Sequence, residues 1–333
     1  MTIKDIARES GYAISTVSRA LNGHPDVSPE ARKRIQEIVA KNGFVPNANA
    51  RRLKSRQGKA VAFIVKGTQN LFFATMMADL QRMIAAEGYA TVIRYLQESE
   101  NEVALAARLC RELKPRGIIF LGGDAQLFEE GFHEVNVPCV LVTAFSEGLS
   151  FENLSTVSVD DRKGAEAGMD LLLDSGHRRT LILGGDPAPC GPSRIRLLGC
   201  TDSLEKHGLA FDPELYCLSD FNMAAAHRSM LDFLDRGGQM DSVFAFSDSM
   251  AIGAMRALAD RGFTVPDDVS VLGFDGTPLI DFCIPRLSSV RQPTKALAAA
   301  CIRCLVDSIR DKKPAQHLLF PAELVLHDSV HSL

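Results

Sequence analysis

The chain opens with Thr2-Ile-Lys-Asp-Ile-Ala-Arg-Glu-Ser-Gly11-Tyr-Ala-Ile-Ser-Thr-Val-Ser-Arg-Ala-Leu-Asn22, in which apolar residues recur at helical spacing on two short segments. Gly11 stands between the segments and supplies the backbone freedom that a tight turn needs. The pattern predicts two short helices joined at Gly11. Their shared apolar side is formed by Ile3, Ile6 and Ala7 on the first helix and by Val17, Ala20 and Leu21 on the second.

The polar residues of the second segment face away from this apolar side. They are Ser15, Thr16, Ser18, Arg19 and Asn22, and their hydroxyl, amide and guanidinium groups suit base edges and phosphates. A narrow apolar stripe with a small, hydrogen-bonding outer face is typical of the recognition helix of a helix-turn-helix. The alternative is a solvated helical hairpin that binds nothing.

A third helix is predicted to follow. Ser28 suits the N-cap, Pro29 suits the first helical position, and Glu30 lies near the positive end of the helix dipole. Asn42-Gly43 is expected to end the helix. Its apolar residues, Ala31, Ile35, Ile38 and Val39, are spaced to pack across the first two helices.

Charge is distributed unevenly along the chain. Residues 1–56 carry 11 lysines and arginines against 5 acids, whereas the remainder carries 26 against 36. A basic head on an acidic body indicates that the head alone attracts a polyanion. The formal net charge of −4 therefore does not argue against DNA binding.

The opening run continues into Gly23, Val27-Ser28, Ala31-Arg32 and Gly43-Phe-Val-Pro46-Asn47-Ala-Asn-Ala50-Arg51-Arg-Leu53. In residue type and spacing, residues 2–53 resemble the DNA-binding head and hinge of the lactose-repressor (LacI/GalR) family of transcriptional regulators. Later residues extend the resemblance, with lower specificity, over nearly the whole chain.

The resemblance implies a hinge helix within Pro46–Ser55 that orders on operator DNA against its dimer mate. Leu53 matches the side chain that wedges between base pairs in the minor groove, although an ordinary linker residue is the alternative. The implied DNA-contacting residues are Thr2, Ile14, Ser15, Thr16, Ser18, Arg19, Asn22, His24, Asn47, Ala50 and Leu53.

From Ala60 onward, apolar runs alternate with amphipathic segments. Continuous apolar strands of this kind predict parallel sheets covered by helices on both faces. Strands are expected at residues 60–65, 90–93, 117–121, 139–142, 157–159, 180–183, 242–246 and 269–273, and helices at 74–87, 102–113, 163–175, 194–207, 224–236 and 249–261.

Two such units in series match the bilobed architecture of periplasmic binding proteins, in which the ligand lies in a cleft at the carboxyl ends of the strands. The predicted fold class is α/β, with an all-α helix-turn-helix head and a body of two doubly wound parallel sheets. The predicted domains are the head (1–45), the hinge helix and linker (46–58), and an effector-binding and dimerisation domain (59–333), with an N-lobe of 59–157 and 291–318 and a C-lobe of 158–290 and 319–333.

No catalytic constellation is found in the sequence. Gly122-Gly123-Asp124 and Gly184-Gly185-Asp186 follow strands, but neither continues into a phosphate-binding motif. His177 is interpreted as structural, and Cys301 and Cys304 as buried apolar residues because no second ligand pair accompanies them. We expect no catalytic residue, cofactor or metal.

Polar and aromatic residues at the predicted strand ends suit a saccharide. The resemblance places here the family's Asn-Pro-Phe-Phe segment, with Leu71 replacing the proline, together with its ligand-binding arginine, aromatic platform and ligand-binding acid. Asp248 also ends a strand, but a helix N-cap is its alternative. The expected effector-binding residues are Asn70, Phe72, Phe73, Arg196, Phe221, Asp248 and Asp275.

The resemblance implies a sequence-specific transcriptional regulator, with a repressor expected. It would bind palindromic double-stranded operator DNA as a homodimer, because one head covers only a half-site. The expected effector is a sugar or sugar derivative. Cys190 and Pro192 replace the arginine and threonine of purine-responsive members, which argues against a purine.

Two other classes of protein remain as alternatives. A solute-binding protein of a sugar transporter explains the bilobed body, but it does not explain the basic head or the missing export signal. A sugar-handling enzyme needs a base and a nucleophile that we cannot identify. No apolar run has the length of a membrane span, so we expect a cytoplasmic protein without a membrane partner.

Overall fold

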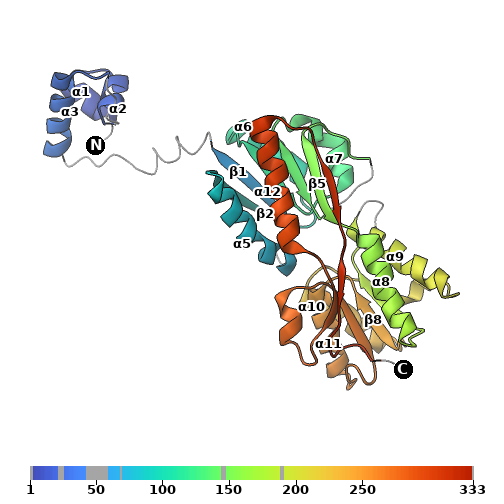
Figure 1. Cartoon of the computed structure of the whole chain (residues 1–333). Coiled ribbons are helices and arrows are strands. Elements are labelled where there is room, and N and C mark those ends of the chain that lie inside the picture. Colours follow the sequence, from blue (N-terminus) through green and yellow to red (C-terminus); the bar gives the residue numbers. More distant parts are fainter. Residues whose placement is uncertain are drawn as a thin grey trace. The chain divides into compact units, whose positions relative to one another are not determined.

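The computed structural model describes residues 3–21, 26–42, 59–67, 70–143, 148–187 and 191–331 (Figure 1). The chain divides into two compact units, Met1–Arg56 and Gln57–Leu333. Each unit has a hydrophobic core of its own. The first unit is called the head below, and the second is called the body.

The head is built from three helices around one small core. α1 (Ile3–Ser10) and α2 (Ile14–Leu21) are separated by Gly11 at φ 76°, and α3 (Pro29–Lys41) packs against both. Ser28 Oγ accepts a hydrogen bond from the Ala31 amide at 3.2 Å, as the N-cap prediction requires. The buried core residues are Ile6, Ala7, Val17, Ala20, Val27, Ala31 and Ile35.

The body contains two six-stranded sheets. The first has the strand order β11-β5-β4-β3-β1-β2, and all its neighbouring strands are parallel. Its strands are β1 (Ala60–Lys66), β2 (Ala90–Leu96), β3 (Gly117–Leu121), β4 (Cys139–Val142), β5 (Leu154–Val159) and β11 (His317–Phe320).

The second sheet has the order β12-β10-β9-β8-β6-β7, and only its edge strand β12 is antiparallel to its neighbour. Its strands are β6 (Thr180–Gly184), β7 (Tyr216–Leu218), β8 (Ser242–Ala245), β9 (Ser270–Asp275), β10 (Ser288–Arg291) and β12 (Glu323–Val325).

Helices cover both faces of each sheet, because successive side chains of a strand point to opposite sides. On the first sheet, Phe63 packs with α5 (Leu71–Ala86) and α12 (Thr294–Asp311), whereas its neighbour Ile64 packs with α6 (Glu102–Glu112) and α7 (Ala125–Gly131). On the second sheet, α8 (Asp161–Asp174) and α9 (Pro192–Lys206) lie on one face, and α10 (Met223–Asp235) and α11 (Asp248–Asp260) lie on the other (Figure 1). Short 3-10 helices lie between these elements, at Phe132–Glu134, Pro213–Leu215 and Pro278–Phe282.

Each sheet with its helices forms one lobe of the body. Within the described chain, the backbone passes between the lobes from β5 to α8, from β10 to α12 and from β11 to β12 (Figure 1). The predicted fold class, a helix-turn-helix head with a bilobed body of parallel-dominated sheets, is confirmed.

Among the body helices with predicted bounds, α6 begins as predicted, and α5, α8, α9, α10 and α11 begin one to three residues earlier. α5 begins at Leu71 and not at residue 74, because Asn70 Oδ1 accepts a hydrogen bond from the Phe72 amide at 3.0 Å and so caps the helix. The alternative that Asp248 is an N-cap is wrong. Ser247 caps α11, since its Oγ accepts a hydrogen bond from the Met250 amide at 3.1 Å.

The head core predicts the effect of truncating its central side chain. Ile35 is fully buried, so Ile35→Ala should destabilise the head by about 2–5 kcal/mol and leave the body folded. Hydrogen exchange measured by mass spectrometry should show lost protection for peptides from residues 3–42 and unchanged protection for β1 and β8. Glu37→Ala, at an exposed position on the same helix, is the control. Unchanged exchange in the head would contradict the assigned core.

Candidate functional site

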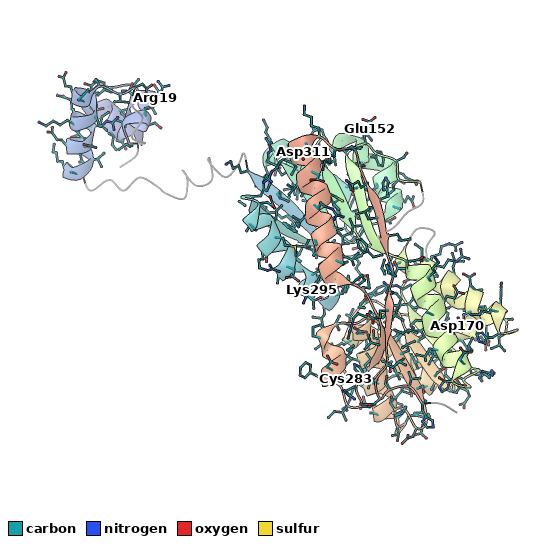
Figure 2. All side chains as sticks on the ribbon, in the orientation of Figure 1. Arg19, Glu152, Asp170, Cys283, Lys295 and Asp311 are labelled. Atoms are coloured by element: carbon teal, nitrogen blue, oxygen red, sulfur yellow. The ribbon has the colours of Figure 1, made fainter. Side chains whose placement is uncertain are left out.

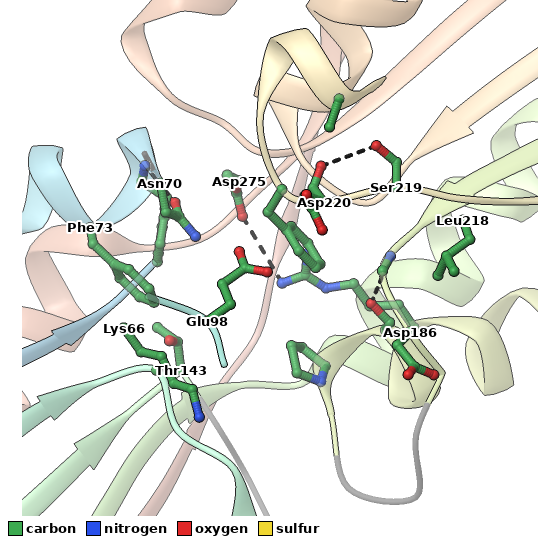
Figure 3. Close-up of a pocket in the computed structure, with 18 of the residues that line it drawn as sticks. Lys66, Asn70, Phe73, Glu98, Thr143, Asp186, Leu218, Ser219, Asp220 and Asp275 are labelled. Carbon is green, nitrogen blue, oxygen red and sulfur yellow. Dashed lines mark hydrogen bonds and ion pairs between the residues drawn. The ribbon is translucent and has the colours of Figure 1, made fainter. Parts of the chain in front are cut away.

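A cavity of about 640 Å³ lies between the two lobes at the carboxyl ends of the parallel strands (Figure 3). Its lining comes from the ends of β1, β2, β3 and β4 on the first lobe and of β6, β7, β9 and β10 on the second, and from helices α5, α9 and α10. Strand carboxyl ends are where parallel α/β folds bind their ligands. We call this cavity the cleft.

Arg196 on α9 is held rigidly in the second-lobe wall. Its Nε donates to Asp161 Oδ1 at 2.7 Å, and its Nη1 donates to the carbonyl oxygen of Phe246. The guanidinium carbon lies 3.7 Å from the centroid of the Phe274 ring. These contacts leave Nη2 beside the cleft, 4.0 Å from Asp275 Oδ1.

Asp275 is the last residue of β9 and lines the cleft from a buried position. Its φ of 111° is one that residues other than glycine rarely adopt, which is a form of strain that clusters at functional sites. Gln292 Nε2 donates a hydrogen bond to Asp275 Oδ1 at 2.8 Å. The structure therefore brings Arg196 and Asp275 together at the cleft, and their contact with an effector stays a prediction.

Gln292 is a cleft residue that the sequence analysis missed. It follows β10 in the segment that leads to the first lobe, and its buried Oε1 has no hydrogen-bond partner among the described residues. An unpaired buried acceptor is costly, so Gln292 is suited to accept a hydrogen bond from a ligand. A polar residue directly after a strand of this sheet was the available signal.

Asp248 does not line the cleft, in contrast to the expectation that its carboxylate faces a ligand. It is fully buried, and both of its oxygens are used within the protein. Oδ2 accepts from the Thr277 amide at 2.6 Å and from Thr277 Oγ1 at 2.8 Å, and Oδ1 accepts from Ser289 Oγ at 2.6 Å. These bonds turn the side chain into the loop that follows Asp275, so Asp248 supports that loop.

The buried carboxyl groups around Arg196 have raised pKa values. Burial raises the pKa of Asp275 well above its ordinary value; the Arg196 charge opposes this shift, and the Asp248 charge adds to it. Burial also raises the pKa of Asp248, to about 6. With Asp161, three carboxyl groups share the field of one guanidinium. The second-lobe wall therefore favours a ligand that donates hydrogen bonds over one that brings negative charge.

The first lobe presents the predicted Asn70, Phe72 and Phe73 to the cleft. The two rings are 3% and 7% exposed, so they offer only a small part of their surface and mainly fill the lobe core. In Figure 3, Asn70 and Phe73 lie on the same side of the cleft. On the opposite wall, Phe221 is partly exposed and packs on the backbone of Gly185, where a Cβ atom would lie 2.7 Å from the ring.

A buried ion pair fixes a further first-lobe residue that the sequence analysis missed. Lys66, the last residue of β1, lines the cleft, and its Nζ lies 2.6 Å from Glu102 Oε2. Glu102 is fully buried, and its Oε1 accepts the Asp124 amide at 2.6 Å. Glu102 thus joins the loops that follow β1 and β3, and it neutralises Lys66.

On the head, the predicted contact residues of α2 lie on its outer side. Ile14, Ser15 and Arg19 are exposed, and Thr16 and Ser18 are half-buried. Figure 2 shows Arg19 on the head, where its Nη1 forms an exposed ion pair with Asp26 at 3.1 Å. The other expected DNA-contacting residues, Thr2, Asn22, His24, Asn47, Ala50 and Leu53, lie outside the described residues.

Comparisons with known proteins agree with both units. Residues 2–47 match the family described as "Bacterial regulatory proteins, lacI family", and residues 169–330 match a periplasmic binding protein-like domain. The HTH-type transcriptional regulator MalR of Clostridium butyricum is 32% identical to this chain, with 100% of both chains covered. The chain belongs to the lacI family of bacterial regulatory proteins.

Solved structures of the lacI family have the same fold. The transcriptional regulator CelR in complex with cellobiose is 27% identical, with a TM-score of 0.72 and 99% of each chain covered. The lac repressor dimer bound to operator is 22% identical, with a TM-score of 0.74 and 99% of each chain covered, and it supports the fold alone. The matches extend over the head as well as the body, so the alternative of a transporter's solute-binding protein has no support.

The described part of this lacI-family regulator contains no group of three or more His, Cys, Asp or Glu side chains that could hold a metal ion. His177 is buried with its Nε2 3.1 Å from the carbonyl oxygen of His331, and Cys301 and Cys304 are buried in α12. None of its described helices is long and apolar enough to cross a membrane.

The raised pKa of Asp248 predicts a pH-dependent stability difference. Between the pKa of this carboxyl in the unfolded chain, about 4, and its folded pKa of about 6, the folded state holds a proton that the unfolded state releases. Raising the pH across this window therefore lowers the free energy of unfolding. From pH 4 to pH 6, the free energy of unfolding of the native chain should fall by at most about 3 kcal/mol relative to that of Asp248→Asn. Above pH 6 the difference between the two proteins should stay constant.

Urea unfolding of both proteins at pH 4, 5, 6 and 7 measures this difference. Asp267→Asn, at an exposed position, serves as the control and should follow the native chain. Parallel pH profiles for Asp248→Asn and the native chain would contradict the raised pKa.

Proposed function

We propose that this regulator is a repressor that binds a palindromic double-stranded operator as a homodimer, and that a neutral sugar in the cleft changes its affinity for that operator. One observation carries the proposal. A single chain combines a helix-turn-helix head, polar on the outer side of α2, with a body whose cleft contains Arg196, Asp275 and Phe221. The head supplies DNA recognition, and the cleft supplies its control.

The DNA-binding side of the proposal rests on the exposed and half-buried side chains on the outer side of α2. Ser15, Thr16, Ser18 and Arg19 can bond base edges or phosphates, and Ile14 offers apolar contact. The lacI-family resemblance adds Thr2, Asn22 and His24 in the head and Asn47, Ala50 and Leu53 in the hinge. One head reads a half-site, so a palindrome requires two copies of the chain.

The charges in the cleft favour a neutral effector. Its acidic lining residues, Glu98, Asp186, Asp220, Asp232 and Asp275, outnumber its basic ones, Lys66, Arg196 and Arg228. Glu102 and Asp161 already neutralise two of these cations. A phosphate or carboxylate would meet net repulsion, whereas sugar hydroxyls can donate to the carboxylates and accept from Arg196. The cellobiose complex of CelR supports this choice of class.

Control of DNA binding follows if the ligand prefers one arrangement of the lobes. The proposed effector residues come from both lobes, with Asn70, Phe72 and Phe73 on the first and Arg196, Phe221 and Asp275 on the second. A ligand that bonds to both walls stabilises the arrangement in which they are correctly spaced. Asp248 acts in this proposal by holding the Asp275 loop.

We further propose the domain limits 1–45 for the head, 46–58 for the hinge helix and linker, and 59–333 for the effector-binding and dimerisation domain. The hinge lies outside the described residues. Membership of a family of transcriptional regulators supports a cytoplasmic protein, where genomic DNA is accessible, without enzymatic activity.

Arg19→Ala tests the recognition helix. Loss of a guanidinium contact to a base or phosphate should lower operator affinity by about tenfold to a hundredfold and leave sugar affinity unchanged. The measurement is a gel-shift titration on a duplex that the native chain selects from random DNA. Arg82→Ala, at an exposed position of α5 in the body, is the matched control. Equal titrations for Arg19→Ala and the native chain would remove α2 from the interface.

Asp275→Asn tests the effector cleft. Asparagine tolerates a positive φ, so the substitution keeps the backbone and replaces the carboxyl group that accepts sugar hydroxyls with an amide. Calorimetric affinity for any sugar that binds the native chain should fall at least about tenfold, with unchanged operator binding in the absence of sugar. Asp267→Asn controls for charge loss elsewhere. Undiminished sugar affinity would move the site away from this cleft.

A further inference from the structure

The cleft extends beyond the residues that hold Arg196 and Asp275. On the second lobe its lining continues from Phe221 across β7 to α10, where it includes Ala225, Arg228, Ser229 and Asp232. These four α10 residues lie at helical positions i, i+3, i+4 and i+7, so they share one face of the helix. This region belongs entirely to the second lobe.

Leu218 is the apolar centre of this extension. It is the last residue of the edge strand β7, and it is 60% exposed although it lines the cleft. Ser229 Oγ donates to the Leu218 carbonyl oxygen at 3.0 Å, which fixes β7 to α10. In Figure 3, Leu218 and Asp186 lie at the opposite end of the lining from Asn70 and Phe73. A fixed, exposed leucine in a polar cleft suits the apolar face of a sugar ring.

The groups around Leu218 can bind hydroxyls. Arg228 and Asp232 are exposed one helical turn apart on α10, and Asp186 and Asp220 approach from the loops after β6 and β7. Arg228 offers cationic hydrogen-bond donors, and the three aspartates offer acceptors. The group lacks the excess of positive charge that a phosphate requires. A cleft of about 640 Å³ also falls in the range of about 300–1,000 Å³ that is typical of pockets for drug-sized ligands.

We propose that the effector is a neutral saccharide of two or more units. One unit occupies the cleft at Arg196, Asp275 and Phe221. The next lies on Leu218 against the Ala225–Asp232 face of α10, which we name the distal subsite. This inference rests on the proposed function, because it assigns a substrate class to the same cleft.

The test compares chain lengths within each of three sugar series. Calorimetry on the full chain uses glucose, maltose, maltotriose, cellobiose, cellotriose, galactose and lactose as probes. A disaccharide or trisaccharide should bind at least about tenfold more tightly than its component monosaccharide. Leu218→Ser should remove most of that gain and leave monosaccharide affinity unchanged. Arg228→Ala, at an exposed helix position, should reduce the same gain independently.

Leu326→Ser is the matched control, because Leu326 is also 60% exposed but lies outside the cleft lining. Its binding profile should equal that of the native chain. Monosaccharide affinity equal to that of every longer probe would overturn the distal subsite, as would unchanged oligosaccharide affinity in both Leu218→Ser and Arg228→Ala. In those cases a loss of sugar affinity of at least about tenfold in Asp275→Asn would leave the proposed function standing. If no probe binds the native chain, both proposals fail.

Discussion

The burial of several carboxyl groups around a single guanidinium is the constraint on which the cleft depends. Arg196 carries the charge that Asp161 and Asp275 need, and it is itself fixed by Asp161, the Phe246 carbonyl and the Phe274 ring. Buried charges persist only where they are paired and hydrogen-bonded. These contacts, together with the hydrogen bonds from Thr277 to Asp248, hold the loop after β9 and place Arg196 and Asp275 at the cleft.

Most of the fold could be predicted from the sequence because its strands are long apolar runs. β1 and β3 are each buried on both faces, so hydrophobicity alone identifies them. β7, β11 and β12 are short edge strands whose residues, apart from the buried Cys217, are half-buried or exposed, and their existence depends on neighbours far away in the chain. Composition alone carries too little signal for such strands.

Cleft residues that belong to a family motif could be predicted from the sequence. Cleft residues that are placed only by strand pairing could not. Arg196 and Asp275 were found by resemblance, and the structure brings them together. Gln292 meets Asp275 because β10 pairs with β9 in a register that places Arg291 opposite Asp275, which the sequence does not reveal. Asp248 looked like a cleft residue, but hydrogen bonds from Thr277 and Ser289 decided its direction.

The position of Gln292 gives the cleft a mechanical property. Its unpaired amide oxygen belongs to one of the backbone links that join the lobes, whereas Arg196 and Phe73 belong to the walls. A ligand hydroxyl that donates to the Gln292 amide oxygen would bind at the link about which the lobes move. Motion about a pivot grows with distance from it, so a restraint of a few tenths of an ångström at this point would govern a much larger excursion at the rims of the body. A ligand bonded at this point would therefore restrict the rotation of one lobe against the other.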